Sequence, residues 1–232
     1  GLIVCALRNE SEELSHKLAE LALAYRNNGC VGFDLAGEEA GHPAVDHLRA
    51  FQLVQRQNFN ITIHAGESFG PESIWQALQY CGAHRIGHGT RLVEDLAVHQ
   101  GRVIKVGSLA QYVIDHRVPL EICLSSNVHT GATPTLAEHP FPLFLQLGMR
   151  LTLNTDNRLM SRTTMTDEYR VAAEQFGCDL DGLETLSING MKSAFAHYDE
   201  RRRIIYERIK DPIAALRREL DLPSRVVYEE RR

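Results

Sequence analysis

Short apolar runs alternate with longer amphipathic stretches along the first two-thirds of the chain. Amphipathic segments with helical spacing lie at 11–27, 43–56 and 71–80. The apolar runs have the length of buried strands, and six are predicted as such: 2–7, 31–37, 61–67, 85–89, 119–125 and 150–156. An alternation of this kind is typical of a parallel α/β sheet.

The remaining segments are predicted to be helical. Residues 91–116 indicate one short and one full helix, and 140–147 a short connecting helix. Beyond residue 164 we expect only helices, which are 167–176, 180–197 and 199–220, the last interrupted at Pro212. The region 164–222 is expected to pack on the sheet within a single domain that covers 1–232. The highly charged end, 223–232, is expected to be frayed.

Two architectures fit this pattern, an open doubly wound sheet and a (β/α)8 barrel. In a barrel the carboxyl ends of all strands face one centre, whereas in an open sheet they converge only at the switch point. Every predicted strand ends near a chemically competent side chain: Arg8, Asp34, His64 with Glu67, His88, Ser125 and Asp156. This favours the barrel. A closed barrel of this type needs eight strands, so we expect the first two to lie upstream of Gly1.

Composition narrows the class of protein. A chain of 232 residues with 44% hydrophobic and 24% charged residues suits one large globular domain. The net charge of -5 and the lack of a basic run argue against a nucleic-acid partner. No apolar stretch is long enough to predict a membrane span, and the first residues do not form a secretory signal. Five scattered cysteines without a CxxC pair argue against a disulfide framework and favour a cytoplasmic location.

Two histidines stand where predicted strands end. His64 closes the apolar run 61–63, and a neutral imidazole at such a place is a good metal ligand. His64 is equally compatible with a hydrogen-bonded core residue. His88 lies between Gly87 and Gly89, which permit a close backbone approach. In a barrel both histidines would share one mouth.

Asp156 follows the apolar run 151–153, and a carboxylate there is costly to bury unless a cation or hydrogen bonds meet it. Asp34 and residues 125–127 are also compatible with purely structural roles. Asp34 would then accept hydrogen bonds from loop amides, and residues 125–127 would form a turn. The sequence contains no P-C-x-x-C, no G-x-G-x-x-G and no P-loop pattern. These absences argue against a cytidine-deaminase zinc site, dinucleotide binding and P-loop chemistry.

Taken in order, DLAGEE, TIHAGE, RIGHG, the SSN run and LNTDN resemble the adenosine deaminase family of the zinc-dependent amidohydrolase barrels. The resemblance covers nearly the whole chain, and GFDLAGEEAG and NTDNRLMS are similar to its bacterial members. It implies strands three to eight of a (β/α)8 barrel, one Zn²⁺ per subunit and a purine nucleoside as the small-molecule partner.

The resemblance also implies roles for particular residues. His64 and Asp156 correspond to zinc ligands, Glu67 to the proton donor for the purine ring, and His88 to the residue over the attacking water. Gly37 corresponds to a backbone contact to the purine. Asn157 stands where many relatives have an acid that donates to the purine N7; an amide can also donate, although Asn157 could instead cap the turn.

The implied activity is the zinc-dependent hydrolytic deamination of adenosine and deoxyadenosine to inosine and ammonia. A sibling hypothesis changes the substrate to adenine or another 6-aminopurine nucleoside. A hypothesis from another class is a barrel that binds a nucleoside or a partner without turnover. The family's His-x-His pair, which gives the other two zinc ligands, is absent from this chain and is expected upstream of Gly1.

Overall fold

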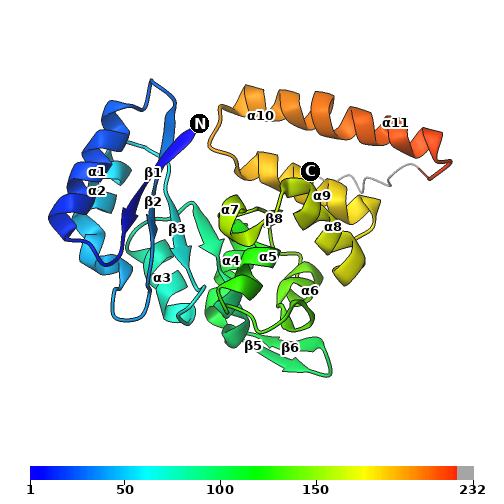
Figure 1. Cartoon of the computed structure of the whole chain (residues 1–232), viewed down its shortest axis with the longest axis horizontal. Helices are drawn as coiled ribbons and strands as arrows, with labels where there is room; N and C mark the ends of the chain where they lie inside the picture. The colour runs from blue at the N-terminus through cyan, green and yellow to red at the C-terminus, as the bar shows by residue number, and fades with distance from the viewer. Residues whose placement is uncertain (224–232) are drawn as a thin grey trace.

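A parallel sheet forms the centre of the computed structural model, which describes residues 1–223 (Figure 1). A bridge between Phe33 and Ile61 joins its two parts and gives the order β1-β2-β3-β4-β7-β8. Among the described residues its strands are β1 (Leu2–Leu7), β2 (Cys30–Ala36), β3 (Thr62–Ala65), β4 (Arg85–His88), β7 (Leu120–Ile122) and β8 (Leu151–Leu153). All neighbours are parallel, as the alternating pattern predicts.

The first helices cover the outer face of this sheet: α1 (Glu12–Ala24), the 3₁₀ turn η1 (Ala44–His47), α2 (Leu48–Arg56) and α3 (Pro71–Gln79). Ser11 begins α1 because its side chain accepts from the Leu14 amide. Pro71 begins α3, where its missing amide costs nothing. Phe33 and Phe51 are fully buried between sheet and helices, with ring centroids 5.5 Å apart.

The segment 91–116 differs from its prediction. The short and the full helix are present as η2 (Thr90–Asp95) and α4 (Ser108–Asp115), but an antiparallel hairpin of β5 (Leu96–His99) and β6 (Arg102–Val106) lies between them. Gln100 and Gly101 form its two-residue turn with φ of 49° and 72°. Such turns need positive φ at both positions and match the twist of a hairpin. The Gln-Gly pair was the overlooked signal.

The strands β3, β7 and β8 end two or three residues earlier than predicted, because helices and turns include the polar residues that follow them. The strand β7 ends at Ile122, and the SSN run belongs to α5 (Leu124–His129) rather than to a strand end or a turn. The strand β8 ends at Leu153, and the chain turns away at Asp156, whose φ is 52°.

Helices complete the described chain: η3 (Leu136–Glu138), α6 (Phe141–Gln146), α7 (Arg158–Ser161), α8 (Met165–Phe176), α9 (Leu180–Ser193), α10 (Tyr198–Ile204), the π-helical η4 (Ile205–Lys210) and α11 (Asp211–Glu219). The predicted interruption at Pro212 is wrong, since helical structure is continuous over 198–219 (Figure 1). The π-helical turn directly before Asp211 widens the helix where proline cannot donate.

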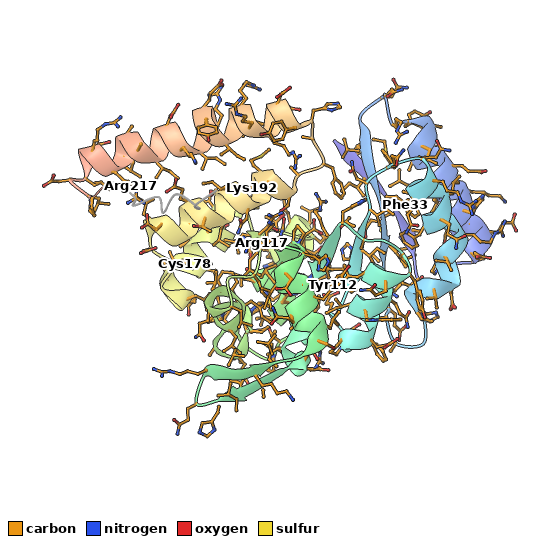
Figure 2. All side chains as sticks on the ribbon, turned by 180° about the vertical axis from the view of Figure 1, so that it is seen from behind. Phe33, Tyr112, Arg117, Cys178, Lys192 and Arg217 are labelled. Carbon is orange, nitrogen blue, oxygen red and sulfur yellow. The ribbon has the colours of Figure 1, made fainter. Side chains whose placement is uncertain are left out.

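The helices α8 and α9 pack on β8, and the long α10–α11 rod lies over α9 (Figure 1). Arg217, labelled on α11 in Figure 2, forms ion pairs with Asp181 and with Glu184 of α9, the latter at 3.6 Å. No helix within residues 1–223 combines the length and the apolar character needed to cross a bilayer. Of the segment expected to fray, residues 224–232 lie outside the described residues.

Candidate active site and metal centre

Unusual backbone conformations mark the carboxyl ends of two strands. His88, the last residue of β4, has a φ of 63°, and Asp156 after β8 has a φ of 52°. Left-handed conformations at residues other than glycine cost on the order of 1 kcal/mol or more and often occur at functional sites. Both residues were predicted as site residues from their place in the sequence.

Close packing of β3 against β4 brings two predicted histidines together. A Cβ built on Gly87 would lie 3.1 Å from the His64 Cα and 3.2 Å from its Cγ, so a side chain at 87 would push the strands apart. The rings of His64 and His88 have centroids 5.2 Å apart. The glycine beside His88 thus serves the close approach that the sequence indicated.

Asp34 at the end of β2 fixes the orientation of His64. The His64 Nδ1 lies 3.0 Å from Oδ2 of Asp34, and Oδ1 of Asp34 accepts from the Leu35 amide at 2.7 Å. Burial alone would lower the pKa of His64, but the charge and hydrogen bond of Asp34, with Glu121 and Asp156, raise it to about 9. A histidine whose Nδ1 is held by a carboxylate presents Nε2 to a metal, as many zinc ligands do.

Among the described residues, one group of three donor side chains lies close enough together to bind the same ion. Ligand atoms of His88, Cys123 and Asp156 all lie within 4.8 Å of one another. Burial raises the pKa of Cys123 well above its ordinary value, and nearby Asp156 and Glu121 raise it further. Its thiol also lies 3.5 Å from the Glu121 carbonyl as a donor, so without a metal Cys123 is a protonated thiol, which would lose its proton on binding a cation. His64 is not part of this group; its Nδ1 is turned to Asp34.

The charges around these donors fit a divalent cation. The carboxylates of Glu67, Glu121 and Asp156 all act on His88, and those of Asp34, Glu121 and Asp156 act on His64. Asp156 is exposed rather than buried, and Glu121 is paired with Arg85 at 2.7 Å. The repulsion that a cation would offset is therefore mainly that of half-buried Glu67 and buried Asp34 with Asp156. Imidazole nitrogen and carboxylate oxygen are both zinc ligands, so the residues present suit Zn²⁺.

The main chain around Glu67 is held by an acid that the sequence analysis did not single out. Glu39, buried to 4% exposure, accepts from the amides of Gly66, Glu67 and Ser68 at 2.8, 2.8 and 2.9 Å. The Glu67 carboxylate then lies 3.6 Å from the His88 Nε2. The second glutamate of DLAGEE was the available signal, since an acid beside two strand ends has loop amides to accept from.

The two predicted purine contacts lie at the same end of the sheet. Gly37 follows β2 with a φ of 105° and is exposed. Asn157 follows Asp156 and caps α7, because its Oδ1 accepts from the Met160 amide at 3.2 Å. The capping role left open by the sequence is thus present. Asp156 accepts from the hydroxyl of buried Ser126 at 2.6 Å, a contact that the sequence analysis missed.

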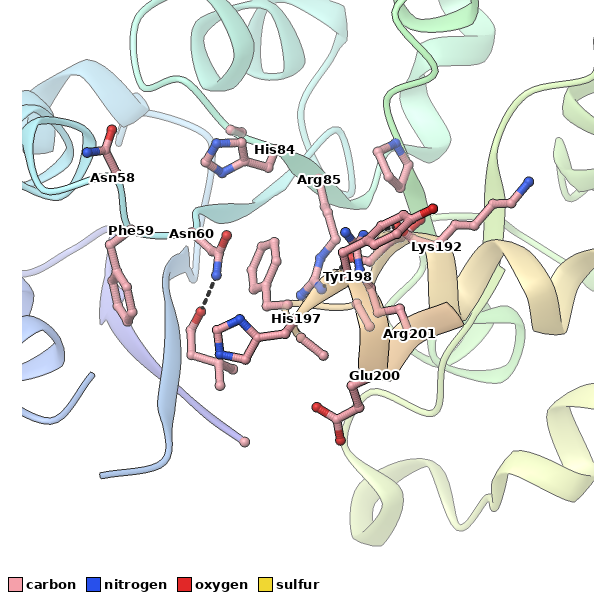
Figure 3. A pocket seen from close by; sticks show the side chains of 18 of the residues that line it. Asn58, Phe59, Asn60, His84, Arg85, Lys192, His197, Tyr198, Glu200 and Arg201 are labelled. Carbon is pink, nitrogen blue, oxygen red and sulfur yellow. Dashed lines mark hydrogen bonds between the residues drawn. The ribbon is translucent and has the colours of Figure 1, made fainter. Parts of the chain in front are cut away.

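A large cavity of about 950 Å³ lies elsewhere, at the amino ends of the strands (Figure 3). Asn60, His84 and Arg85 from the starts of β3 and β4 line one wall, and Lys192 and Arg201 line another. None of the predicted site residues lines this cavity.

Comparisons with known proteins agree with the geometry. The family model described as adenosine deaminase matches residues 1–212. An adenosine deaminase from Streptomyces coelicolor is 51% identical over 219 residues, which cover 94% of this chain and 55% of that protein. The chain therefore spans little more than half the length of this curated relative.

Two solved structures have similar folds. The adenine deaminase from Arthrobacter aurescens gives a TM-score of 0.81 at 25% identity, covering 94% of this chain and 61% of that one. A Zn-bound amidohydrolase from Burkholderia ambifaria gives 0.79 at 18% identity, covering 92% and 58%, respectively. The second likeness concerns the fold alone, and both agree with the barrel-type architecture favoured over the open sheet.

Proposed function

The chain belongs to the adenosine deaminase family, and from this premise we propose that it carries out the zinc-dependent hydrolytic deamination of adenosine and deoxyadenosine to inosine and ammonia. The observation that carries the proposal is the convergence of His64, Glu67, His88 and Asp156 at the carboxyl ends of three strands. Each comes from a motif that resembles the family, and their mutual arrangement has the donors and the acid that this reaction needs.

We assign His64, through its free Nε2, and Asp156 as the zinc ligands of this chain, and two further histidines are expected from outside it. Bound Zn²⁺ would supply a Lewis acid that lowers the pKa of water from 15.7 toward about 7. Asp34 keeps the His64 ring in place through Nδ1. Ser126 does the same for the Asp156 carboxylate.

Glu67 is assigned as the general acid. Attack at C6 of the purine moves electrons to N1, and a protonated Glu67 carboxyl would deliver a proton there. The three amide contacts of Glu39 hold the Glu67 backbone for this transfer. His88, 3.6 Å from Glu67, would hold the attacking oxygen in line. Gly37 and Asn157 would bind the purine ring.

Other properties belong to the same proposal. We expect one Zn²⁺ per subunit, a cytoplasmic location and a single barrel-type domain over 1–232 in which helices 164–222 form the outer layer. A second candidate substrate is adenine, favoured by the likeness to an adenine deaminase. The two substrates differ by the ribose, so the ratio of their kcat/KM values decides between them.

The test is turnover by the zinc-loaded full-length protein, measured as ammonia release from adenosine, from adenine and from deoxyadenosine. Glu67→Gln is expected to lower kcat at least about 100-fold, the effect of losing an acid-base group, while zinc content stays the same. Glu72→Gln makes the same change on the exposed start of α3 and should leave kcat unchanged. Purine binding without any turnover in the parent protein would favour the non-catalytic hypothesis.

A further inference from the structure

Two buried side chains, His139 and Asn127, connect the start of α6 to His88. The Phe141 amide donates to Nδ1 of His139 at 3.0 Å, and Nε2 of His139 lies 3.2 Å from Oδ1 of Asn127. The Asn127 Nδ2 lies 2.9 Å from Nδ1 of His88. His88, Asn127 and His139 are at most 3% exposed, so water does not compete for these contacts.

The direction of every hydrogen bond in this series follows from the first one, in which the Phe141 amide donates to His139. A backbone amide can only donate, so the His139 Nδ1 that faces it must be without a proton. A neutral imidazole then carries its proton on Nε2 and donates to Asn127. The Asn127 atom that receives this proton must be the oxygen, which leaves the amide nitrogen to donate to His88. The Nδ1 of His88 is therefore an acceptor, and its proton sits on Nε2.

The contact with Asn127 by itself leaves the Nδ1 of His88 without a proton, and burial keeps the His139 imidazole neutral. Burial lowers the pKa of His139 to about 4. The Phe141 and Phe176 rings lie edge-on to His139, at 6.3 and 6.1 Å between centroids, and hold its ring plane.

We propose that Asn127 and His139 are positioning residues that hold His88 as the neutral tautomer with its proton on Nε2. This nitrogen faces the Glu67 carboxylate, at 3.6 Å. In the deamination reaction, and resting on the function proposed above, His88 would then donate a hydrogen bond to the attacking oxygen. It would not remove a proton from it, because Nε2 already carries one.

The isosteric substitution Asn127→Asp reverses the direction of the hydrogen bond between residue 127 and His88. In Asn127→Asp the ionised carboxylate has no proton to donate, so it can only accept from both histidines. The Nδ1 of His88 must then carry a proton, while shape and volume at 127 are nearly unchanged. A role of Asn127 in packing alone predicts no such change at the His88 ring.

The experiment is ¹⁵N NMR of histidine-labelled, Zn²⁺-loaded full-length protein, with the His88 signals assigned by their loss in His88→Gln. We expect an unprotonated Nδ1 and a protonated Nε2 in the parent, and a protonated Nδ1 in Asn127→Asp. The kcat for adenosine should fall about 100-fold in this variant, with KM within a few fold of the parent value. Asn60→Asp, the same change at the amino end of β3, should leave the His88 signals unchanged.

A parent spectrum with a proton on Nδ1, or Asn127→Asp with unchanged His88 signals, would overturn the proposal. If Asn127→Asp does not fold, His139→Gln serves instead: the fixed donor at 139 is lost, and His88 should show a mixture of tautomers, whereas a single unchanged tautomer would contradict the inference. The NMR result does not depend on turnover. A protein without deaminase activity but with the expected spectra would remove the proposed function and retain the positioning roles.

Discussion

The two ends of the parallel sheet differ in the charges that gather there and in the partners that hold the charged side chains. At the carboxyl end, carboxylates and imidazoles are held by specific partners, such as Asp34 on His64 and Ser126 on Asp156. At the amino end, a wide cavity is lined by basic side chains, among them Arg85, Lys192 and Arg201, which are labelled in Figure 3. Arg26, Arg117 and Arg150 line the same cavity. Burial lowers the pKa of Arg150, and its like-charged neighbours Arg117 and Arg201 lower it further.

This contrast teaches that the volume of a cavity does not locate the chemistry. In the cavity at the amino end Arg85 pairs with Glu121 at 2.7 Å, but Arg26, Arg117 and Arg201 donate to backbone carbonyls rather than to titratable groups. The candidate active site has strained backbone at His88 and Asp156 and a buried hydrogen-bond chain behind it. Precise orientation of titratable groups, rather than open space, separates the two ends.

The largest effect is expected from removal of a donor side chain at the carboxyl end of the sheet. Asp156→Ala is expected to lower zinc affinity at least about tenfold and turnover at least about 100-fold, because a ligand carboxylate is lost. His88→Ala should lower turnover to a similar degree while zinc is retained. Zinc per subunit, measured by elemental analysis after dialysis, checks both. Zinc loss in His88→Ala would favour the His88, Cys123 and Asp156 group as the metal site instead.

A smaller effect is expected where a buried acid supports the site without touching the substrate. Glu39→Gln replaces one accepting oxygen by a donor opposite backbone amides, which should cost about 2 kcal/mol in the free energy of unfolding. The neighbouring Glu38 is exposed, and Glu38→Gln should change this free energy by less than about 0.5 kcal/mol. Denaturant unfolding measures both. Equal stability of the two variants would mean that the amide contacts of Glu39 do not hold the loop.

The smallest expected effect is a gain in stability, from a substitution at the amino end of the sheet. Among the described residues Arg150 has no acidic ion-pair partner, and two arginines repel it. Arg150→Gln is therefore expected to stabilise the fold by at most about 0.5 kcal/mol after solvent screening, and the gain should vanish in about 1 M salt. Arg102→Gln on the β5–β6 hairpin is the control. Destabilisation by Arg150→Gln at low salt would show that the basic cluster is structurally required.

Much of the fold was predictable because strand and helix periods are local properties of the chain. The six strands and the helices over 11–27, 43–56 and 71–80 are confirmed in kind and approximate place. The predicted elements were wrong where two local structural preferences conflict. The Gln100–Gly101 turn makes a hairpin inside a stretch expected to be helical, and a π-helical turn carries the last helix past Pro212.

The candidate site was predictable only as a set of strand ends. Motifs indicated His64, Glu67, His88 and Asp156, since chemically competent side chains recur after apolar runs. Their roles remain proposals. The partners that hold them were not assigned, although Glu39 lies in DLAGEE and Ser126 and Asn127 lie in the SSN run, because a polar residue beside a strand end is equally compatible with turn or cap chemistry.

The parallel α/β class, the preference for a barrel and the motifs that resemble a known family follow from the amino-acid order alone, because they depend on periodicity and on residue types at strand ends. Only the tertiary structure decided that Asp34 pairs with His64, that Glu39 holds the Glu67 loop and that a buried chain ends on His88. Such contacts join residues 12 to 39 positions apart, and their geometry is fixed by how strands and helices pack rather than by any local pattern.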